Sequence, residues 1–251
     1  MHDAQVAERP AAARPDSSET VLEISGLQGF YGESHVLHGI ALNVKRGELV
    51  TLLGLNGAGK TSTLRAIIGL LARKGSIRFC GNETIGLAPE AIARLGIGYV
   101  PEERGIFSSL SVEENLMLPP VVKPGGMSLS EIYALFPNLL ERRNSQGTKL
   151  SGGEQQMLAI ARILRTGADL ILLDEPTEGL APVIIEQIGV VVRQLKARGL
   201  TILLVEQNFH FAKSIADRHY VVEEGSVVGM FTNASLDSPE TIDRLNAYLG
   251  V

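Results

Sequence analysis

The eight residues GLNGAGKT, numbers 54–61, constrain the fold more than any other feature of the sequence. They match the pattern G-x-x-x-x-G-K-[ST] and stand between the apolar run ELVTLLG and a stretch with helical spacing at Leu64, Ile67, Ile68 and Leu71. Strand, loop and helix in this order form a phosphate-binding loop, because the N–H groups of the loop and of the helix N-terminus converge on phosphate oxygens. The sequence therefore predicts a P-loop.

Two side chains of this loop have predicted chemical tasks. Lys60 reaches the β- and γ-phosphates of a nucleotide, and Thr61 places its hydroxyl on Mg²⁺. A glycine-rich loop without a ligand is the alternative, and the presence of strand, helix, Lys and Thr together disfavours it. The other predicted nucleotide-binding residues of the loop are Gly54, Leu55, Asn56, Gly57, Ala58, Gly59 and Ser62.

Charge and composition exclude several classes of protein. The formal net charge is -5 over 251 residues and Lys and Arg are not clustered, which argues against a protein that coats nucleic acid. Cys80 is the single cysteine, so no intramolecular disulfide can form. The apolar runs are too short to cross a bilayer, and the N-terminus lacks the apolar core of a signal peptide. We expect a soluble, cytoplasmic protein whose membrane role, if it has one, is peripheral.

The order of strand and helix signals predicts an α/β P-loop NTPase with a RecA-like, mostly parallel sheet. Residues 1–20, rich in Ala, Pro and charge, read as a flexible tail, and residues 21–251 as one domain. The segments VLEISGL, VLHGIALNVKRGE and GSIRFCGNETI indicate an antiparallel β subdomain. Helix signals dominate from about 103 to 165 and predict an inserted helical subdomain, after which strands and helices alternate.

A second predicted site follows the apolar strand in ADLILLDEPT. Its two carboxylates, Asp174 and Glu175, stand at the end of a buried strand, where acids are costly unless they have a task. Asp174 is suited to hold Mg²⁺, and Glu175 to orient and deprotonate the water that attacks the γ-phosphate. A solvated turn before Pro176 is the alternative, which the P-loop makes the weaker one.

The segment KLSGGEQQMLAIARIL contains a third signal. Ser151 and Glu154 have capping-box spacing, so a well-started helix explains much of it. Gly152 and Gly153 in the first turn are costly for a helix, however, and indicate that something approaches the backbone closely. An anion would suit the free N–H groups, and a second phosphate-binding surface beside the P-loop suggests two surfaces that close on one nucleotide.

In this order, GLNGAGKT, LSGGEQQ and LILLDEPT resemble the ATP-binding cassette of ABC transporters, from about Val21 to Gly229. The resemblance implies ATP with Mg²⁺, and two cassettes packed head to tail with each ATP between one P-loop and the partner's LSGGE. By the same resemblance Tyr31 stacks on adenine, although an aromatic on a β surface remains the alternative.

Three positions depart from the usual cassette pattern. Glu102 stands where a glutamine normally contacts Mg²⁺, and it adds negative charge near the γ-phosphate. Ala181 replaces an aspartate after the second site, which removes that side chain's link across a dimer. Gln207, at the end of the strand in LLVEQN, replaces a histidine that contacts the γ-phosphate, and Asn208 caps the next helix. The implied catalytic residues are thus Glu175, Gln207 and Lys60, and the implied metal ligands are Thr61, Asp174 and Glu102.

The motifs VPEERGIF, DEPTEGLAP and LLVEQN resemble the LivF-like subgroup, which powers uptake of branched-chain amino acids and related amides. This implies an importer ATPase at the cytoplasmic face of the inner membrane. Its implied partners are a second cassette, two transmembrane permease subunits and, indirectly, an extracytoplasmic solute-binding protein, with no nucleic acid. The permease would dock on the helical insertion and on residues 102–107.

Two other classes remain open. A soluble cassette that acts on nucleic acid or ribosomes usually carries long coiled coils or basic extensions, which this sequence lacks. A P-loop small-molecule kinase would need no LSGGE segment and would show an Arg-rich lid.

Overall fold

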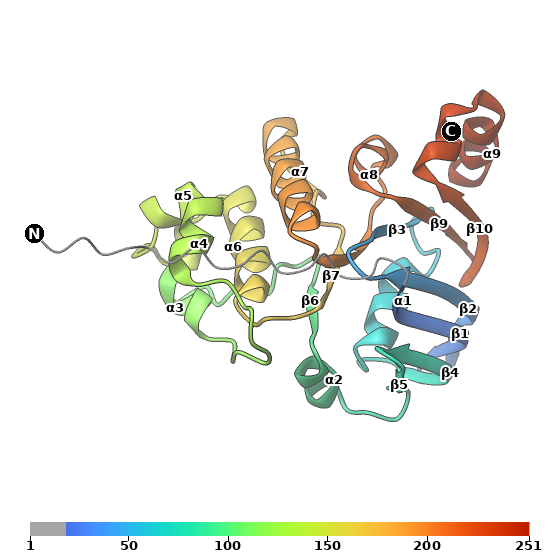
Figure 1. Ribbon diagram of the computed structural model, residues 1–251, viewed down its shortest axis with the longest axis horizontal. Coiled ribbons are helices and arrows are strands. Elements are labelled where there is room, and N and C mark those ends of the chain that lie inside the picture. The colour runs from blue at the N-terminus through green and yellow to red at the C-terminus, as the bar shows by residue number, and fades with distance from the viewer. Residues whose placement is uncertain (1–18, 251) are drawn as a thin grey trace, which may run out of the picture.

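The computed structural model describes residues 19–250. The predicted tail lies outside the described residues up to residue 18, and Thr20 already begins the first strand. The chain forms one antiparallel and one mostly parallel sheet with helices around them (Figure 1), which agrees with the predicted α/β fold. Within residues 19–250, no helix is both long and apolar enough to span a bilayer.

The antiparallel sheet has the strand order β2-β1-β4-β5. In the predicted strand VLHGIALNVK, Ile40, Leu42 and Val44 are buried while Ala41 and Lys45 are exposed, as the alternation requires. The buried face shares one apolar cluster with residues of the helix after the P-loop and of the parallel sheet. The strands are β1 (Thr20–Tyr31), β2 (Ser34–Lys45), β4 (Ala72–Phe79) and β5 (Asn82–Glu83).

The second sheet has the order β10-β9-β3-β8-β7-β6, and all its neighbours are parallel except β9 and β10. Every residue of β3, β7 and β8 is buried, because helices and the other sheet cover both faces. The carboxyl ends of these strands therefore meet at one edge. The strands are β3 (Leu49–Leu53), β6 (Ile97–Val100), β7 (Leu170–Asp174), β8 (Thr201–Val205), β9 (Arg218–Glu223) and β10 (Ser226–Thr232).

Helices connect and cover the parallel strands. The four apolar residues that predicted a helix after the P-loop are all buried, but α1 ends at Ile67, so Ile68 and Leu71 lie beyond the helix. The sequence did not single out α2 or α9, and each of these helices buries a single residue, Ile92 and Leu245 respectively, so their apolar pattern is weak. The elements are α1 (Lys60–Ile67), α2 (Pro89–Leu95), α7 (Pro182–Ala197), α8 (Phe209–Ile215), the 3-10 helix η2 (Asn233–Asp237) and α9 (Pro239–Leu249).

Short helices occupy the segment predicted as an insertion and lie at one end of the long axis of the molecule (Figure 1). Capping boxes at Ser111, Ser128 and Ser151 start three of them. They share an apolar cluster with α7 and the parallel strands that is distinct from the cluster under the antiparallel sheet. They are α3 (Val112–Met117), α4 (Leu129–Leu135), α5 (Pro137–Glu141), the 3-10 helix η1 (Gly147–Lys149) and α6 (Gly152–Leu164).

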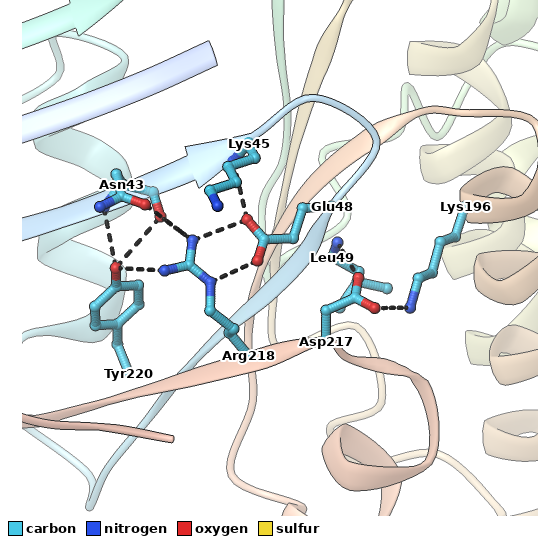
Figure 2. Close-up of polar contacts among 8 residues, drawn as sticks. All are labelled: Asn43, Lys45, Glu48, Leu49, Lys196, Asp217, Arg218 and Tyr220. Carbon is cyan, nitrogen blue, oxygen red and sulfur yellow. Dashed lines mark hydrogen bonds and ion pairs between the residues drawn. The ribbon is translucent and has the colours of Figure 1, made fainter. Parts of the chain in front are cut away.

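A polar network joins the two sheets at the amino ends of β3 and β9 (Figure 2). Arg218 forms an ion pair with Glu48 in which both side chains are largely buried. Its guanidinium also donates to the carbonyl and side-chain oxygens of Asn43 in β2, at 2.9 and 3.0 Å, and to the hydroxyl of Tyr220 at 3.2 Å. The antiparallel sheet is thereby fixed to the sheet that carries the P-loop.

Candidate functional site

The P-loop leads from the end of β3 into α1. Gly54 has φ +150°, and a Cβ there would lie 2.2 Å from the carbonyl oxygen of Val222, so only glycine can begin the loop. Gly59, at φ +107°, is the N-cap of α1. Leu55, Asn56 and Gly57 are exposed at the loop tip, where the predicted phosphate contacts would be made.

Lys60 is folded back into this loop. Its Nζ donates to the carbonyl oxygens of Gly54 and Leu55, at 3.0 Å each, and lies 3.7 Å from Oε1 of Glu175. The side chain is 3% exposed, and burial lowers the pKa of Lys60 while the charge of Glu175 opposes this shift. The ammonium therefore lies between the loop and the predicted catalytic carboxylate.

Asp174 links the second predicted site to α1. Its Oδ1 accepts from the Thr61 hydroxyl at 2.9 Å, and its Oδ2 accepts from the Tyr99 hydroxyl at 2.8 Å. Asp174 is fully buried at the end of β7, and this burial raises its pKa, although both hydrogen bonds oppose the shift. The sequence did not single out Tyr99, which reaches Asp174 because β6 is paired with β7.

Glu175 and Gln207 meet across the strand tips. The amide Nε2 of Gln207 donates to Oε2 of Glu175 at 2.6 Å, although the two residues are 32 apart in sequence. Glu175 has φ +44°, a left-handed conformation that is uncommon outside glycine, and its N–H donates to the carbonyl of Val205 at 3.0 Å. With the backbone in this conformation, the Glu175 carboxylate contacts both Lys60 and Gln207.

Glu102 follows β6 and is exposed. Partial burial raises its pKa, and the negative charges of Glu175 and Asp174 add to the shift, so Glu102 faces the same acidic group. Among the described residues no three His, Cys, Asp or Glu side chains are grouped closely enough to hold a metal alone. Oxygen donors from Thr61 and Asp174 suit Mg²⁺, which usually completes its coordination with water and substrate phosphates.

The LSGGE segment begins α6 as the capping-box pattern predicts. Ser151 accepts from the N–H of Glu154 at 3.3 Å, and the Glu154 carboxylate accepts from the N–H of Ser151 at 2.7 Å. A Cβ at Gly153 would lie 2.7 Å from a side-chain carbon of Ile184 in α7, whereas one at Gly152 would meet the Arg104 guanidinium at 3.4 Å. The close approach that the glycines predicted thus comes partly from this chain's own helix packing.

The structure brings the P-loop, Asp174, Glu175 and Gln207 together but leaves the LSGGE segment apart. The α6 helix lies among the insertion helices, and β6 and β7 separate it from α1 in Figure 1. Tyr31 ends β1 and is 42% exposed. The pKa of Arg65 in α1 is raised, chiefly by the polar interaction of its guanidinium with the Tyr31 hydroxyl, so the two side chains are neighbours. Tyr31 therefore borders the helix that carries the P-loop.

Comparison with known sequences identifies relatives along almost the whole chain. The family model for ABC transporters matches residues 37–178. The high-affinity branched-chain amino acid transport ATP-binding protein BraG of Pseudomonas aeruginosa is 44% identical over 235 residues, covering 92% of this chain and all of BraG. The lipopolysaccharide export system ATP-binding protein LptB of Escherichia coli is 34% identical over 236 residues, covering 91% of this chain and 97% of LptB.

Solved structures of ATP-binding cassettes share the fold. A nucleotide-free cassette from an ABC transporter superimposes with a TM-score of 0.75 at 23% identity, covering 89% of this chain and 98% of that one. A dimeric cassette in a post-hydrolysis state, bound to ADP and Pi, gives a TM-score of 0.72 at 26% identity, covering 84% and 98%.

Proposed function

The chain belongs to the ABC transporter family of ATP-binding cassettes, which are ATPases, and we propose that it powers uptake of branched-chain amino acids or related amides. The main structural support for ATP hydrolysis is the contact between Glu175 and Gln207, with Lys60 beside it. It groups an acceptor for a proton, an amide that can orient water and a cation for the phosphates at one sheet edge.

In the proposed mechanism, Glu175 accepts the proton of the water that attacks the γ-phosphate. Gln207 holds this carboxylate through its Nε2 and presents its amide oxygen to the water, and Lys60 neutralises charge on the β- and γ-phosphates. Thr61 and Asp174, with Glu102 nearby, would hold Mg²⁺. When bound, this ion supplies further neutralisation of phosphate charge.

The active unit in this proposal is a dimer of cassettes. One chain has its LSGGE segment apart from its own P-loop (Figure 1), so each ATP would need the Ser151–Glu154 segment of a second cassette. The N–H groups of Gly152 and Gly153 at the start of α6 would then face the phosphates that the first P-loop holds. The dimeric cassette structure among the relatives supports this pairing.

An apolar face supports docking of a permease. It surrounds a pocket of about 310 Å³ lined mainly by apolar side chains between α1, α2, β6 and the segment after α3. Large apolar side chains are exposed after α1, in the loop between β6 and α3, and in and after α3, which is costly in water unless a partner covers them. They are Leu70 (57% exposed), Phe107 (49%), Met117 (54%), Leu118 (49%) and Val121 (63%).

The solute assignment is based on the relative BraG, which is named for branched-chain amino acid transport and matches over its full length. LptB, which is named for lipopolysaccharide export, is less similar at 34% identity and is the weaker guide. In the proposed complex two cassettes bind two permease subunits at the cytoplasmic face of the membrane. An extracytoplasmic binding protein delivers the solute.

Uptake in cells or proteoliposomes tests the proposal. We expect the protein to co-purify with integral permease subunits and to support ATP-dependent uptake of leucine. Val121→Asp should disrupt both, because it places a charge on the apolar face, whereas Met230→Asp, at an apolar position on β10 that is 50% exposed, should not. Recovery with ribosomes or nucleic acid instead of membranes would contradict the importer assignment.

A further inference from the structure

Glu206 is a buried acid with no role in the mechanism above. It follows β8 directly, precedes Gln207, and is 2% exposed. An ionisable group in such a place is costly unless hydrogen bonds compensate for the lost water. The hydrogen-bond partners of Glu206 therefore indicate which parts of the chain this residue connects.

The carboxylate of Glu206 has partners in two loops. Its Oε1 accepts from the hydroxyl of Thr177 at 2.7 Å. Its Oε2 accepts from the backbone N–H groups of Gln207 and Asn208, at 3.2 Å each. Glu206 thus connects the loop after β7 to the turn after β8.

Thr177 lies in the loop that carries the proposed base. It is two residues beyond Glu175 and 5% exposed, and its carbonyl accepts from the N–H of Leu180 in a tight turn. The Thr177 hydroxyl has Glu206 as its acceptor, so this contact and the bond from the Glu175 N–H to the Val205 carbonyl fix the two loops relative to each other.

The turn after β8 needs such support because the Gln207 side chain is exposed. Packing does not hold its amide, yet Nε2 reaches Oε2 of Glu175 at 2.6 Å. Glu206 holds the Gln207 backbone N–H, and Asn208 continues the turn by capping α8 through the N–H of Phe211 at 3.0 Å. A shift of this backbone would move the amide away from the carboxylate.

We propose that Thr177 and Glu206 form a positioning pair that sets Gln207 against Glu175 for ATP hydrolysis. The inference rests on the proposed roles of Glu175 and Gln207. Neither Thr177 nor Glu206 touches the substrate in this proposal. Both act through the Gln207 amide, and a loss of the hydroxyl of Thr177 should therefore matter only while that amide is present.

The burial of Glu206 supports this role. Desolvation raises its pKa to about 7, even though the hydrogen bonds from Thr177, Asn208 and Gln207 favour the ionised form. A side chain selected for stability alone would be apolar here, since replacing buried ionisable groups by well-packed apolar ones is often neutral or stabilising.

A double-mutant cycle on the full-length chain tests the proposal. The variants are Thr177→Val, which removes the hydroxyl at nearly constant shape, Thr177→Ser, which keeps it, Gln207→Ala, and Thr177→Val combined with Gln207→Ala. Steady-state hydrolysis of Mg-ATP gives kcat and KM, and rates are expressed per titrated ATP-binding site so that an unfolded fraction does not imitate a slow enzyme.

We expect Thr177→Val to lower kcat about tenfold with KM within about twofold of wild type, because a misplaced positioning group slows chemistry more than binding. Thr177→Ser should restore kcat. In the Gln207→Ala background, Thr177→Val should cause no further loss.

Two results would overturn this inference but not the proposed role of Gln207. One is an unchanged kcat in Thr177→Val. The other is a slow Gln207→Ala whose kcat falls again, by the same factor as in the wild-type background, when Thr177→Val is added. A fully active Gln207→Ala would overturn the proposed role of Gln207 and this inference with it. The two failures are therefore distinguishable.

Discussion

The amide Nε2 of Gln207 donates to Oε2 of Glu175 across 2.6 Å, between the tips of the neighbouring parallel strands β8 and β7. The other oxygen of Glu175 lies 3.7 Å from Nζ of Lys60. The carboxylate is therefore held from two sides, by an uncharged donor and by a cation. A histidine in place of Gln207 could change its charge near neutral pH, whereas an amide cannot. Of these two residues, only Glu175 can therefore accept a proton.

Glu175→Gln should abolish hydrolysis but leave ATP binding intact. The substitution keeps the size and the contact with Gln207 but removes the proton acceptor, so we expect kcat to fall about a hundredfold or more. Equilibrium binding of ATP, measured by titration, should change little. Glu240→Gln, which neutralises an exposed carboxylate on α9, is the control and should hydrolyse ATP normally. Hydrolysis at the wild-type rate in Glu175→Gln would remove Glu175 from its proposed role.

Gln207→Glu should shift the pH dependence of hydrolysis. It puts a second carboxylate against Glu175, and two like charges at this distance cannot both ionise easily, so the pair binds a proton more tightly. The acid limb of the kcat profile should move to higher pH by about one unit or more. Asn208→Asp is the matched control, because Asp caps a helix as well as Asn does and the carboxylate stays at the cap of α8. Identical profiles for Gln207→Glu and wild type would show that the contact is absent during catalysis.

The parts of the site that follow local sequence patterns could be predicted. The P-loop, the buried strand before Asp174 and the capping box at Ser151 each depend on neighbours within a few residues. The helix cap at Asn208 is likewise local, and the structure confirms it, since its Oδ1 accepts from the N–H of Phe211.

The contacts that tune the site could not be predicted from the sequence. Tyr99 is 75 residues from Asp174, and Thr177 is 29 residues from Glu206, so only the register of β6, β7 and β8 brings them together. Gly153 is a different case. The sequence pattern indicated that something approaches its backbone closely, and in the structure the side chain of Ile184 from the same chain does so. The LSGGE segment lies apart from the P-loop of its own chain (Figure 1), so its role stays a prediction.

The burial of Glu206 predicts a pH-dependent stability. Its pKa is about 7 in the folded protein, against an ordinary value of 4.5, so the folded state binds the proton more tightly than the unfolded state. The resulting stabilisation is present below pH 4.5 and is lost as pH rises to about 7. Relative to Glu206→Gln, the wild-type free energy of unfolding should therefore fall by about 3 kcal/mol between pH 4.5 and 8.

Urea unfolding of both proteins across this pH range measures the difference directly. Taking the difference cancels the titration of all other groups, and Glu240→Gln controls for the loss of one negative charge. A constant difference between wild type and Glu206→Gln from pH 4.5 to 8 would mean that the carboxyl titrates alike in the folded and unfolded states.

The network in Figure 2 predicts unequal stabilities for two ion pairs that lie side by side. Arg218 and Glu48 expose only 14% and 12% of their side chains, and Arg218 also holds Asn43 of the antiparallel sheet. Lys196 and Asp217 expose 28% and 41%. Water screens the second pair, whereas removal of Arg218 leaves the largely buried Glu48 carboxylate without its cation. The first pair should therefore be the more costly to break.

We expect Arg218→Ala to lower the free energy of unfolding by about 2 to 4 kcal/mol, and Lys196→Ala to lower it by at most about 1 kcal/mol. Arg218→Lys should recover only part of the loss, since an ammonium cannot bind both oxygens of Glu48 and the carbonyl of Asn43 together. Urea unfolding of the three variants gives the values. Equal losses for Arg218→Ala and Lys196→Ala would mean that burial does not set the strength of these pairs, and that the joint between the sheets depends on apolar packing instead.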